Sequence, residues 1–179
     1  IRSLDYLKDS GLIISLELAG GAGDEDEYQE IRELAEKCPF AVTFAGKITQ
    51  QELAKKMNQS DVFVLPSFYE GLPLVIIEAL ACGTYVICTD LPGIRKWIHQ
   101  NLPDNGVVFV EPPKRVNEDE PVEEELPVFE KELAGAIEGI AKYPGSKPEK
   151  KQLEQISWDG LCVHLMQIFE QQSVYRKNL

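Results

Sequence analysis

Two hydrophobic periodicities alternate along the first 110 residues of the chain. Short runs rich in branched and aromatic residues, such as Phe-Ala-Val-Thr-Phe at 40–44, are typical of strands. The longer segments between these runs carry apolar residues at helical spacing, and glycine, proline or capping residues separate the two kinds of segment. The runs predict strands at 12–19, 40–44, 61–65, 84–88 and 106–110.

The intervening segments predict helices that have recognisable ends. Asp24 to Asp26 supply acidic caps for one helix, Thr49 caps the next, and Gly83 ends the helix that begins at Leu74. The strict alternation of strand and helix, with short turns, predicts an α/β fold in which helices cover both faces of a parallel sheet. The predicted helices span 1–8, 27–37, 50–57, 74–82 and 93–100.

The chain departs from this alternation after residue 110. Residues 112–127 hold four prolines and a run of acids, which predicts a solvated surface insertion. A helix is predicted over 128–142, followed by a mostly helical tail over 148–171 that is interrupted near Ser157. Because 1–8 already has the pattern of an amphipathic helix and no methionine precedes it, we expect 1–179 to be a single domain of a longer polypeptide.

Composition limits the partners and the compartment. The net charge of −12 argues against nucleic acid or an anionic membrane surface as the main partner. The sequence has no signal peptide and no apolar run of membrane-spanning length, so we expect a cytoplasmic protein, whose complete form could still associate peripherally with a membrane. The four cysteines lack metal-site spacing and only two histidines are present, which predicts buried, reduced thiols and no metal site.

Glu78 is the exception in the most apolar helix that the sequence predicts. A helix that is apolar nearly all round is buried, so its carboxylate must be paired, be neutral or face a cavity. A vicinal diol of a ligand is one partner, because a carboxylate accepts two hydroxyl hydrogen bonds at once. The alternative is a salt bridge to Arg95 or Lys96, or access to water, and the residues alone leave both open.

Glu70 precedes the same helix in a glycine-containing turn that follows the strand at 61–65. Strand, turn and helix in this order build ligand sites at the carboxyl ends of parallel strands, and the helix N-terminus attracts phosphate. An acid beside an anion site suits a ligand with a charged part and a hydroxylated part, such as a phosphate-linked sugar. The alternative is an ordinary polar loop residue.

The stretch VLPSFYEGLPLVIIEALACG, from Val64 to Gly83, resembles the C-terminal domain signature of the group 1 (family 4) retaining glycosyltransferases. Residues 44–48 and 105–109 are similar to two flanking segments of that family, and Ser157-Trp158 is similar to its short motif before the final helix. The resemblance covers roughly residues 12–110. It implies a Rossmann-like domain that forms the C-terminal half of a GT-B enzyme, and it implies a nucleoside-diphosphate sugar as the donor.

The resemblance also implies a role for each matching residue. Glu70 would contact the donor sugar as the catalytic carboxylate, and Glu78 would bind the ribose hydroxyls. The other implied donor-binding residues are Gly71, Leu72, Pro73 and Leu74 at the diphosphate and sugar, Lys47 and Ile48 at the base, and Gly20 and Gly21 near the cleft.

One departure from the family pattern bears on activity. The family's diphosphate-binding Arg and Lys lie on a strand and turn that would precede Ile1, and its N-terminal acceptor domain lies further upstream. Neither segment is in this sequence. We therefore expect the chain alone to bind a donor weakly and not to turn over.

Two other motifs are set aside. Asp24-Glu25-Asp26 has the spacing of the metal motif of the other glycosyltransferase fold, but its position at a helix start favours capping. We expect no metal and no cofactor, with the nucleotide sugar as a substrate. The turn at 20–23 lacks the Gly-x-Gly-x-x-Gly fingerprint, which disfavours a dehydrogenase.

The sequence thus favours the donor-binding domain of a retaining glycosyltransferase of hexosyltransferase type, acting in glycan or polysaccharide biosynthesis. Its expected partners are a nucleoside-diphosphate sugar and its own N-terminal domain. Two alternatives remain: a phosphorylase or epimerase that uses the same cleft, and a non-catalytic nucleotide-sugar binding module.

Overall fold

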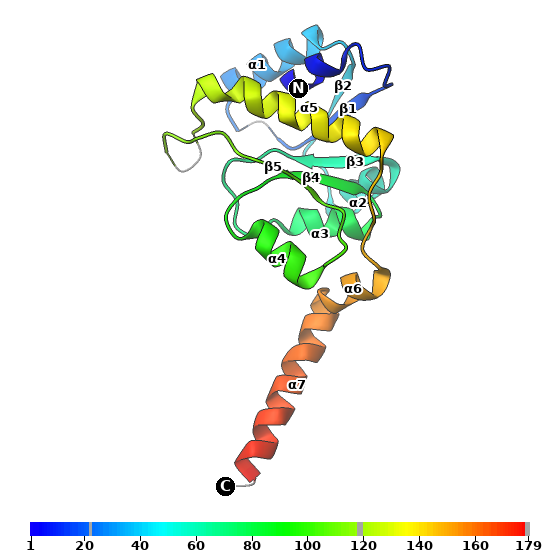
Figure 1. Cartoon of the computed structure of the whole chain (residues 1–179), viewed down its shortest axis with the longest axis vertical. Helices are drawn as coiled ribbons and strands as arrows, with labels where there is room; N and C mark the ends of the chain where they lie inside the picture. Colours follow the sequence, from blue (N-terminus) through cyan, green and yellow to red (C-terminus); the bar gives the residue numbers. More distant parts are fainter. Residues whose placement is uncertain (22, 118–119, 178–179) are drawn as a thin grey trace.

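The predicted strands form two parallel sheets (Figure 1). The computed structural model describes residues 1–21, 23–117 and 120–177, and within them no backbone ladder joins one sheet to the other. The alternation predicted one continuous sheet, and this continuity is not found in the described residues. Hydrophobic periodicity indicates whether a strand is buried, but it does not indicate which strands pair with it. The first sheet pairs β1 (Ser15–Ala19) with β2 (Ala41–Gly46), and the second has the order β3 (Val62–Leu65), β4 (Tyr85–Thr89), β5 (Val108–Val110).

Helices cover both faces of the second sheet, which confirms the predicted fold class. In Figure 1, α5 lies on one side of β3–β5, and α3 and α4 lie on the other. The described helices are the 3-10 helices η1 (Arg2–Leu7) and η2 (Glu123–Glu125), and α1 (Glu25–Lys37), α2 (Gln50–Gln59), α3 (Leu74–Ala81), α4 (Ile94–Asn101), α5 (Leu126–Lys142), α6 (Lys150–Gln155) and α7 (Trp158–Lys177).

Strand β4 shows how the sequence produces these layers. Its neighbouring side chains point to opposite faces, as strand geometry requires. Val86 and Cys88 pack with α2, α3 and α4, whereas Ile87 packs with Phe129 and Leu133 of α5. An unbroken apolar strand is therefore buried on both sides.

The predicted caps are confirmed. Asp24 Oδ1 accepts hydrogen bonds from the backbone amides of Asp26 (2.9 Å) and Glu27 (3.1 Å), so this acid begins α1. Thr49 and Glu52 form a reciprocal capping box on α2. Gly83 ends α3 with a φ of 77°, a left-handed conformation that favours glycine.

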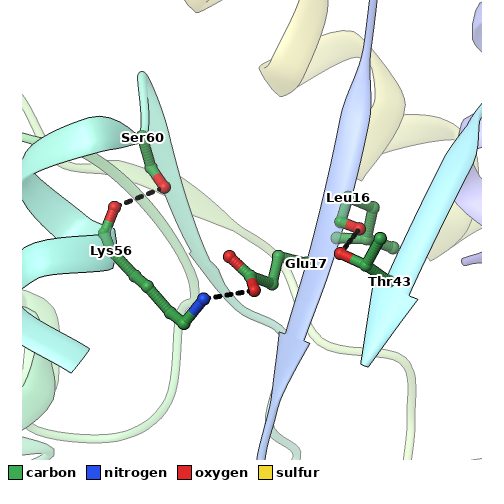
Figure 2. Close-up of polar contacts among 5 residues, drawn as sticks. All are labelled: Leu16, Glu17, Thr43, Lys56 and Ser60. Carbon is green, nitrogen blue, oxygen red and sulfur yellow. Dashed lines mark hydrogen bonds and ion pairs between the residues drawn. The ribbon is translucent and has the colours of Figure 1, made fainter. Parts of the chain in front are cut away.

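An ion pair connects the first sheet to the helix before β3. Lys56 Nζ of α2 lies 2.5 Å from Glu17 Oε1 of β1 (Figure 2). On the opposite face, Leu16 packs with Leu4 and Leu7 of η1. Strand β1 therefore has η1 packed on one face and α2 attached on the other.

The C-terminal part is helical, with the predicted interruption near Ser157. Figure 1 shows α7 extending away from the sheets, and its described apolar side chains are exposed. Cys162 of α7 is exposed, so the expectation that all four thiols are buried is wrong; Cys88 is buried, and Cys38 and Cys82 are half-buried. No helix among the described residues is long and apolar enough to cross a bilayer.

Candidate functional site

The candidate residues lie in the segments that follow the carboxyl ends of β1, β2 and β3, and on α3. Loops at this edge of a parallel sheet are where α/β proteins bind ligands. The segment between β3 and α3 carries Glu70 and Gly71, and α3 itself carries Glu78. The fold thus brings the sequence-predicted residues to the expected edge.

Glu78 is held by a neutral amide. Gln50 Nε2, in the first turn of α2, donates a hydrogen bond of 2.9 Å to Glu78 Oε1. The expectation that α3 is buried nearly all round is partly wrong: Ile76, Ala79 and Leu80 are buried, but Leu74 is 52% exposed and Glu78 is half-buried. The carboxylate therefore reaches the surface beside α2.

The alternative salt bridge to Arg95 does not form. The Arg95 guanidinium instead pairs with Asp90 at 2.6 Å and with Glu111 at 3.7 Å, and the hydrogen bond that Arg95 donates to Asp90 is the main cause of its raised pKa. Among the described residues, none of the ion pairs involves Glu78. A carboxylate with a single amide partner keeps lone pairs for hydroxyl donors.

Glu70 lies in a short span between two fixed points. The Phe68 ring packs edge-on against Phe129 of α5, with centroids 5.2 Å apart, and the Pro73 carbonyl accepts from the Ile76 amide at 3.1 Å. Residues 69–72, all described, make no hydrogen bond within the described chain, and Tyr69 is 62% exposed. The span presents Glu70, Gly71 and Leu72 without internal polar partners.

The start of α3 leaves amides available. Pro73 is its N-cap residue and offers no side-chain hydrogen bond, so the amides of Leu74 and Val75 have no partner in the described chain. Unsatisfied amides at a helix N-terminus favour an anion. Glu70 thus precedes a group of donors that suits a phosphate.

The loops after β1 and β2 are in contact. The Gly20 amide donates to the Gly46 carbonyl at 3.0 Å. The Lys47 side chain lies so close to Gly21 that a Cβ there would fall 2.3 Å from Lys47 Cε. Lys47 is exposed, and the neighbouring Ile48 is half-buried. Gly21 therefore provides room for Lys47 to lie across this edge.

Gln50 is the residue that sequence reasoning missed. Its segment starts with Lys47 and Ile48, so 47–50 contacts both Gly21 and Glu78. Gln50 and Glu78 are 28 positions apart on different helices, so no local sequence pattern predicts their contact. The one available signal was a polar residue directly after the Thr49 cap.

Neither of two hollows on the described surface lies at this edge. No group of three or more potential metal ligands is present among the described residues. Two shallow hollows lie elsewhere: one is lined by Tyr6, Pro127, Val128, Lys131 and Glu132, and the other by Arg32, Ala35, Glu36, Val42 and Phe44. The candidate site lies outside both hollows.

Known proteins resemble the chain at the level of a family. The family model described as glycosyl transferases group 1 matches residues 1–119. The putative glycosyltransferase EpsF of Bacillus subtilis (strain 168) is 40% identical over 87 residues, which are 48% of this chain and 21% of that protein. The alpha-maltose-1-phosphate synthase of Mycobacterium tuberculosis (strain CDC 1551 / Oshkosh) is 23% identical over 167 residues, 87% of this chain and 40% of that protein.

Solved structures with the same architecture are GT-B glycosyltransferases. A sucrose-phosphate synthase from Thermosynechococcus elongatus has a TM-score of 0.62 at 23% identity, over 97% of this chain and 42% of that one. The pneumococcal O-GlcNAc transferase GtfA, in complex with UDP and GlcNAc, has a TM-score of 0.56 at 18% identity, over 79% of this chain and 25% of that one. The chain spans less than half the length of each of these relatives.

Proposed function

The chain belongs to the group 1 glycosyltransferase family, and from this membership we propose that it is the donor-binding domain of a retaining enzyme. The enzyme transfers a hexose from a nucleoside-diphosphate sugar to an acceptor, in glycan or polysaccharide biosynthesis. The observation that carries the proposal is the Glu78 carboxylate, which reaches the surface with Gln50 as its only hydrogen-bond partner in the described chain.

A ribose diol is the partner that this carboxylate suits. Two neighbouring hydroxyls donate to the two oxygens of one carboxylate, and the charge makes each hydrogen bond stronger than a neutral one. A cation at Glu78 would have satisfied the same oxygens, but Arg95 is occupied by Asp90. Gln50 keeps one oxygen in place while lone pairs on both oxygens stay available.

The remaining donor groups follow from the same edge. The free amides at the start of α3 would stabilise the diphosphate, on which negative charge grows as the anomeric bond breaks. Glu70 would accept hydrogen bonds from sugar hydroxyls, with Gly71, Leu72 and Pro73 forming the wall beside the sugar. Lys47 and Ile48 would border the base, and Gly20 and Gly21 would allow close approach.

The unpaired edges of the two sheets favour a domain whose sheet is completed by a strand from another part of the protein. In the order 3-2-1-4-5-6 of doubly wound folds, the first strand lies between the second and the fourth. Here β1 and β3 each have an unpaired edge in the described chain, and the Lys56–Glu17 pair joins β1 to α2, the helix directly before β3. One more parallel strand between them would produce that six-stranded order. The acceptor would bind to a second domain, and catalysis would occur between the two.

The test is calorimetric titration of the complete protein with UDP, GDP and ADP and with their glucose conjugates. We expect one conjugate to bind more tightly than its bare nucleotide. We expect Glu78→Gln to weaken the binding of both the conjugate and the nucleotide about tenfold or more. Glu33→Gln, an exposed acid of α1, is the control for the change of charge. Unchanged binding in Glu78→Gln would refute the ribose assignment.

Product analysis then separates the reaction classes. A retained anomeric configuration in a new glycoside supports the transferase. Release of a sugar phosphate from the donor in the presence of phosphate would instead indicate a phosphorylase, and binding without any turnover of the complete protein would indicate a binding module. No metal is expected to be required, so EDTA should leave the rate unchanged.

A further inference from the structure

A small hairpin forms within the acidic, proline-rich segment 112–127. Arg115 and Pro121 form an antiparallel bridge, and the Val122 amide donates to the Lys114 carbonyl at 2.8 Å. The Val116 amide donates to the Glu120 carbonyl, also at 2.8 Å. These contacts pair 114–116 with 120–122, and the two described arms, 114–117 and 120–122, are called the 114–122 hairpin.

The base of the 114–122 hairpin is attached to the start of α5. Glu125, the N-cap residue of α5, accepts from both the backbone amide and the Nζ of Lys114, each at 2.6 Å. These two hydrogen bonds lower the pKa of Glu125, and the side-chain one raises the pKa of Lys114. The pair is exposed, so its effect is to orient the hairpin more than to stabilise the fold.

The hairpin reaches the loop that carries Glu70. Arg115 Nη1 donates a hydrogen bond of 2.9 Å to the carbonyl oxygen of Phe68. The Phe68 ring is packed against Phe129 in the same α5 whose N-cap holds the hairpin. Phe68 is therefore fixed through its side chain and through its carbonyl, and both attachments lead back to α5.

The position of Glu70 depends on these attachments. Glu70 follows Phe68 by two residues, and the span 69–72 has no hydrogen bond of its own in the described chain. The next fixed point is the buried Pro73. An unbonded span of four residues is defined by its two ends, so loss of one end lets Glu70 move.

We propose that the 114–122 hairpin fixes the place of Glu70, with Arg115 acting as a positioning residue for the sugar-binding loop. A guanidinium suits this task because its donors are arranged in a rigid planar fork. The consequence for the sugar rests on the proposed function, whereas the attachment of the loop does not. The two parts are therefore tested separately.

Chymotrypsin cleavage after Tyr69 tests the attachment without any ligand. Proteolysis requires local opening, so Arg115→Gln should raise the rate of cleavage at this bond about fivefold or more, as followed by mass spectrometry. Arg115→Lys should restore most of the protection, because an ammonium also donates to a carbonyl. Arg2→Gln is the control, because Arg2 is an exposed arginine paired with Glu130 on α5. An unchanged rate in Arg115→Gln overturns the proposal.

Titration of the complete protein tests the consequence for the sugar. Arg115→Gln should weaken the binding of the preferred nucleotide sugar about five- to tenfold. The affinity for the bare nucleotide should stay within about twofold of that of the original protein. Equal weakening of both overturns the positioning role, since Arg115 would then act on the fold or on the phosphates. If the unaltered protein binds no nucleotide sugar, the proposed function fails, and the cleavage rates still decide on the attachment.

A second variant protects the test against misfolding. Glu125→Gln releases the base of the hairpin but leaves Arg115 and Phe68 in place. It should raise cleavage after Tyr69 in the same direction and by a smaller factor. No rise in this variant, together with an Arg115→Gln protein that is unfolded by circular dichroism, counts against the hairpin.

Discussion

Gln50 and Glu78 form a hydrogen bond of 2.9 Å between the first turn of α2 and the middle of α3. The contact joins the segment after β2 to the helix that follows the Glu70 loop. It orients the Glu78 carboxylate, and among the described residues no ion pair competes with a ligand there.

Replacement of Gln50 by leucine should weaken the binding of the nucleotide. Leucine keeps a similar size but removes the donor, so Glu78 loses the group that holds one oxygen in place. We expect the Kd of the bare nucleotide and that of its sugar conjugate to rise together, by about three- to tenfold, in calorimetric titration. Gln51→Leu is the matched control, because Gln51 is exposed and has no partner in the described chain. Equal effects of the two variants would contradict a specific role for Gln50.

Gly21→Ala should affect the ligand rather than the fold. The new Cβ would fall 2.3 Å from Lys47 Cε, and a flexible, exposed side chain can move away from it. We expect the melting temperature to stay within about 2 °C, because exposed substitutions cost little, and we expect nucleotide affinity to change because Lys47 is displaced. Gly23→Ala, with nothing within 4 Å of its Cβ, should change neither quantity. A large loss of stability in Gly21→Ala would show that the backbone there needs glycine.

Gly106→Ala should have the opposite outcome. The φ of Gly106 is 68°, and a Cβ would fall 1.9 Å from the backbone oxygen of Ser146, which cannot rotate away. We expect a loss of about 2 kcal/mol or more in the free energy of unfolding, measured by urea denaturation. Gly135→Ala in α5 has open space around its Cβ and should instead stabilise by about 0.5–1 kcal/mol. A neutral Gly106→Ala would mean that segment 144–148 moves easily.

The sequence predicted what depends on local pattern. Asp24, Thr49 and Gly83 could be recognised as helix ends because a cap acts on amides or carbonyls a few residues away. The order of strands and helices followed from periodicity for the same reason. The Glu70 and Glu78 positions followed from a strand, turn and helix that lie together in the sequence.

The sequence did not reveal what depends on distant contacts. Two contacts join distant positions: Gln50 to Glu78, 28 positions apart, and Arg115 to Phe68, 47 positions apart. The residue types alone do not predict these partners. The acidic composition of 112–127 predicted solvation, but it could not show that 114–116 pair with 120–122. The burial of α7 was not predicted from the sequence, and its described apolar side chains are exposed.

Cys88 and Cys162 have very different surroundings. Burial in β4, more than the nearby Asp90, raises the pKa of Cys88 to about 12, from an ordinary value near 9. Cys162 on α7 is exposed. Because the thiolate is the reactive form, iodoacetamide at pH 8 should modify Cys162 and leave Cys88 intact until the protein unfolds. Mass spectrometry of tryptic peptides measures both sites in one experiment.

The same shift makes stability depend on alkaline pH. Below pH 9 Cys88 is protonated in both the folded and the unfolded protein, so its full contribution to the free energy of unfolding is present. Between about pH 9 and pH 12 only the unfolded thiol ionises, so the free energy of unfolding should fall by up to about 1.4 kcal/mol per pH unit. Other groups also titrate there, so the measurement is the difference between the original protein and Cys88→Val in urea denaturation at each pH. Cys88→Val should lose less stability between pH 9 and pH 11, and identical slopes would contradict the raised pKa.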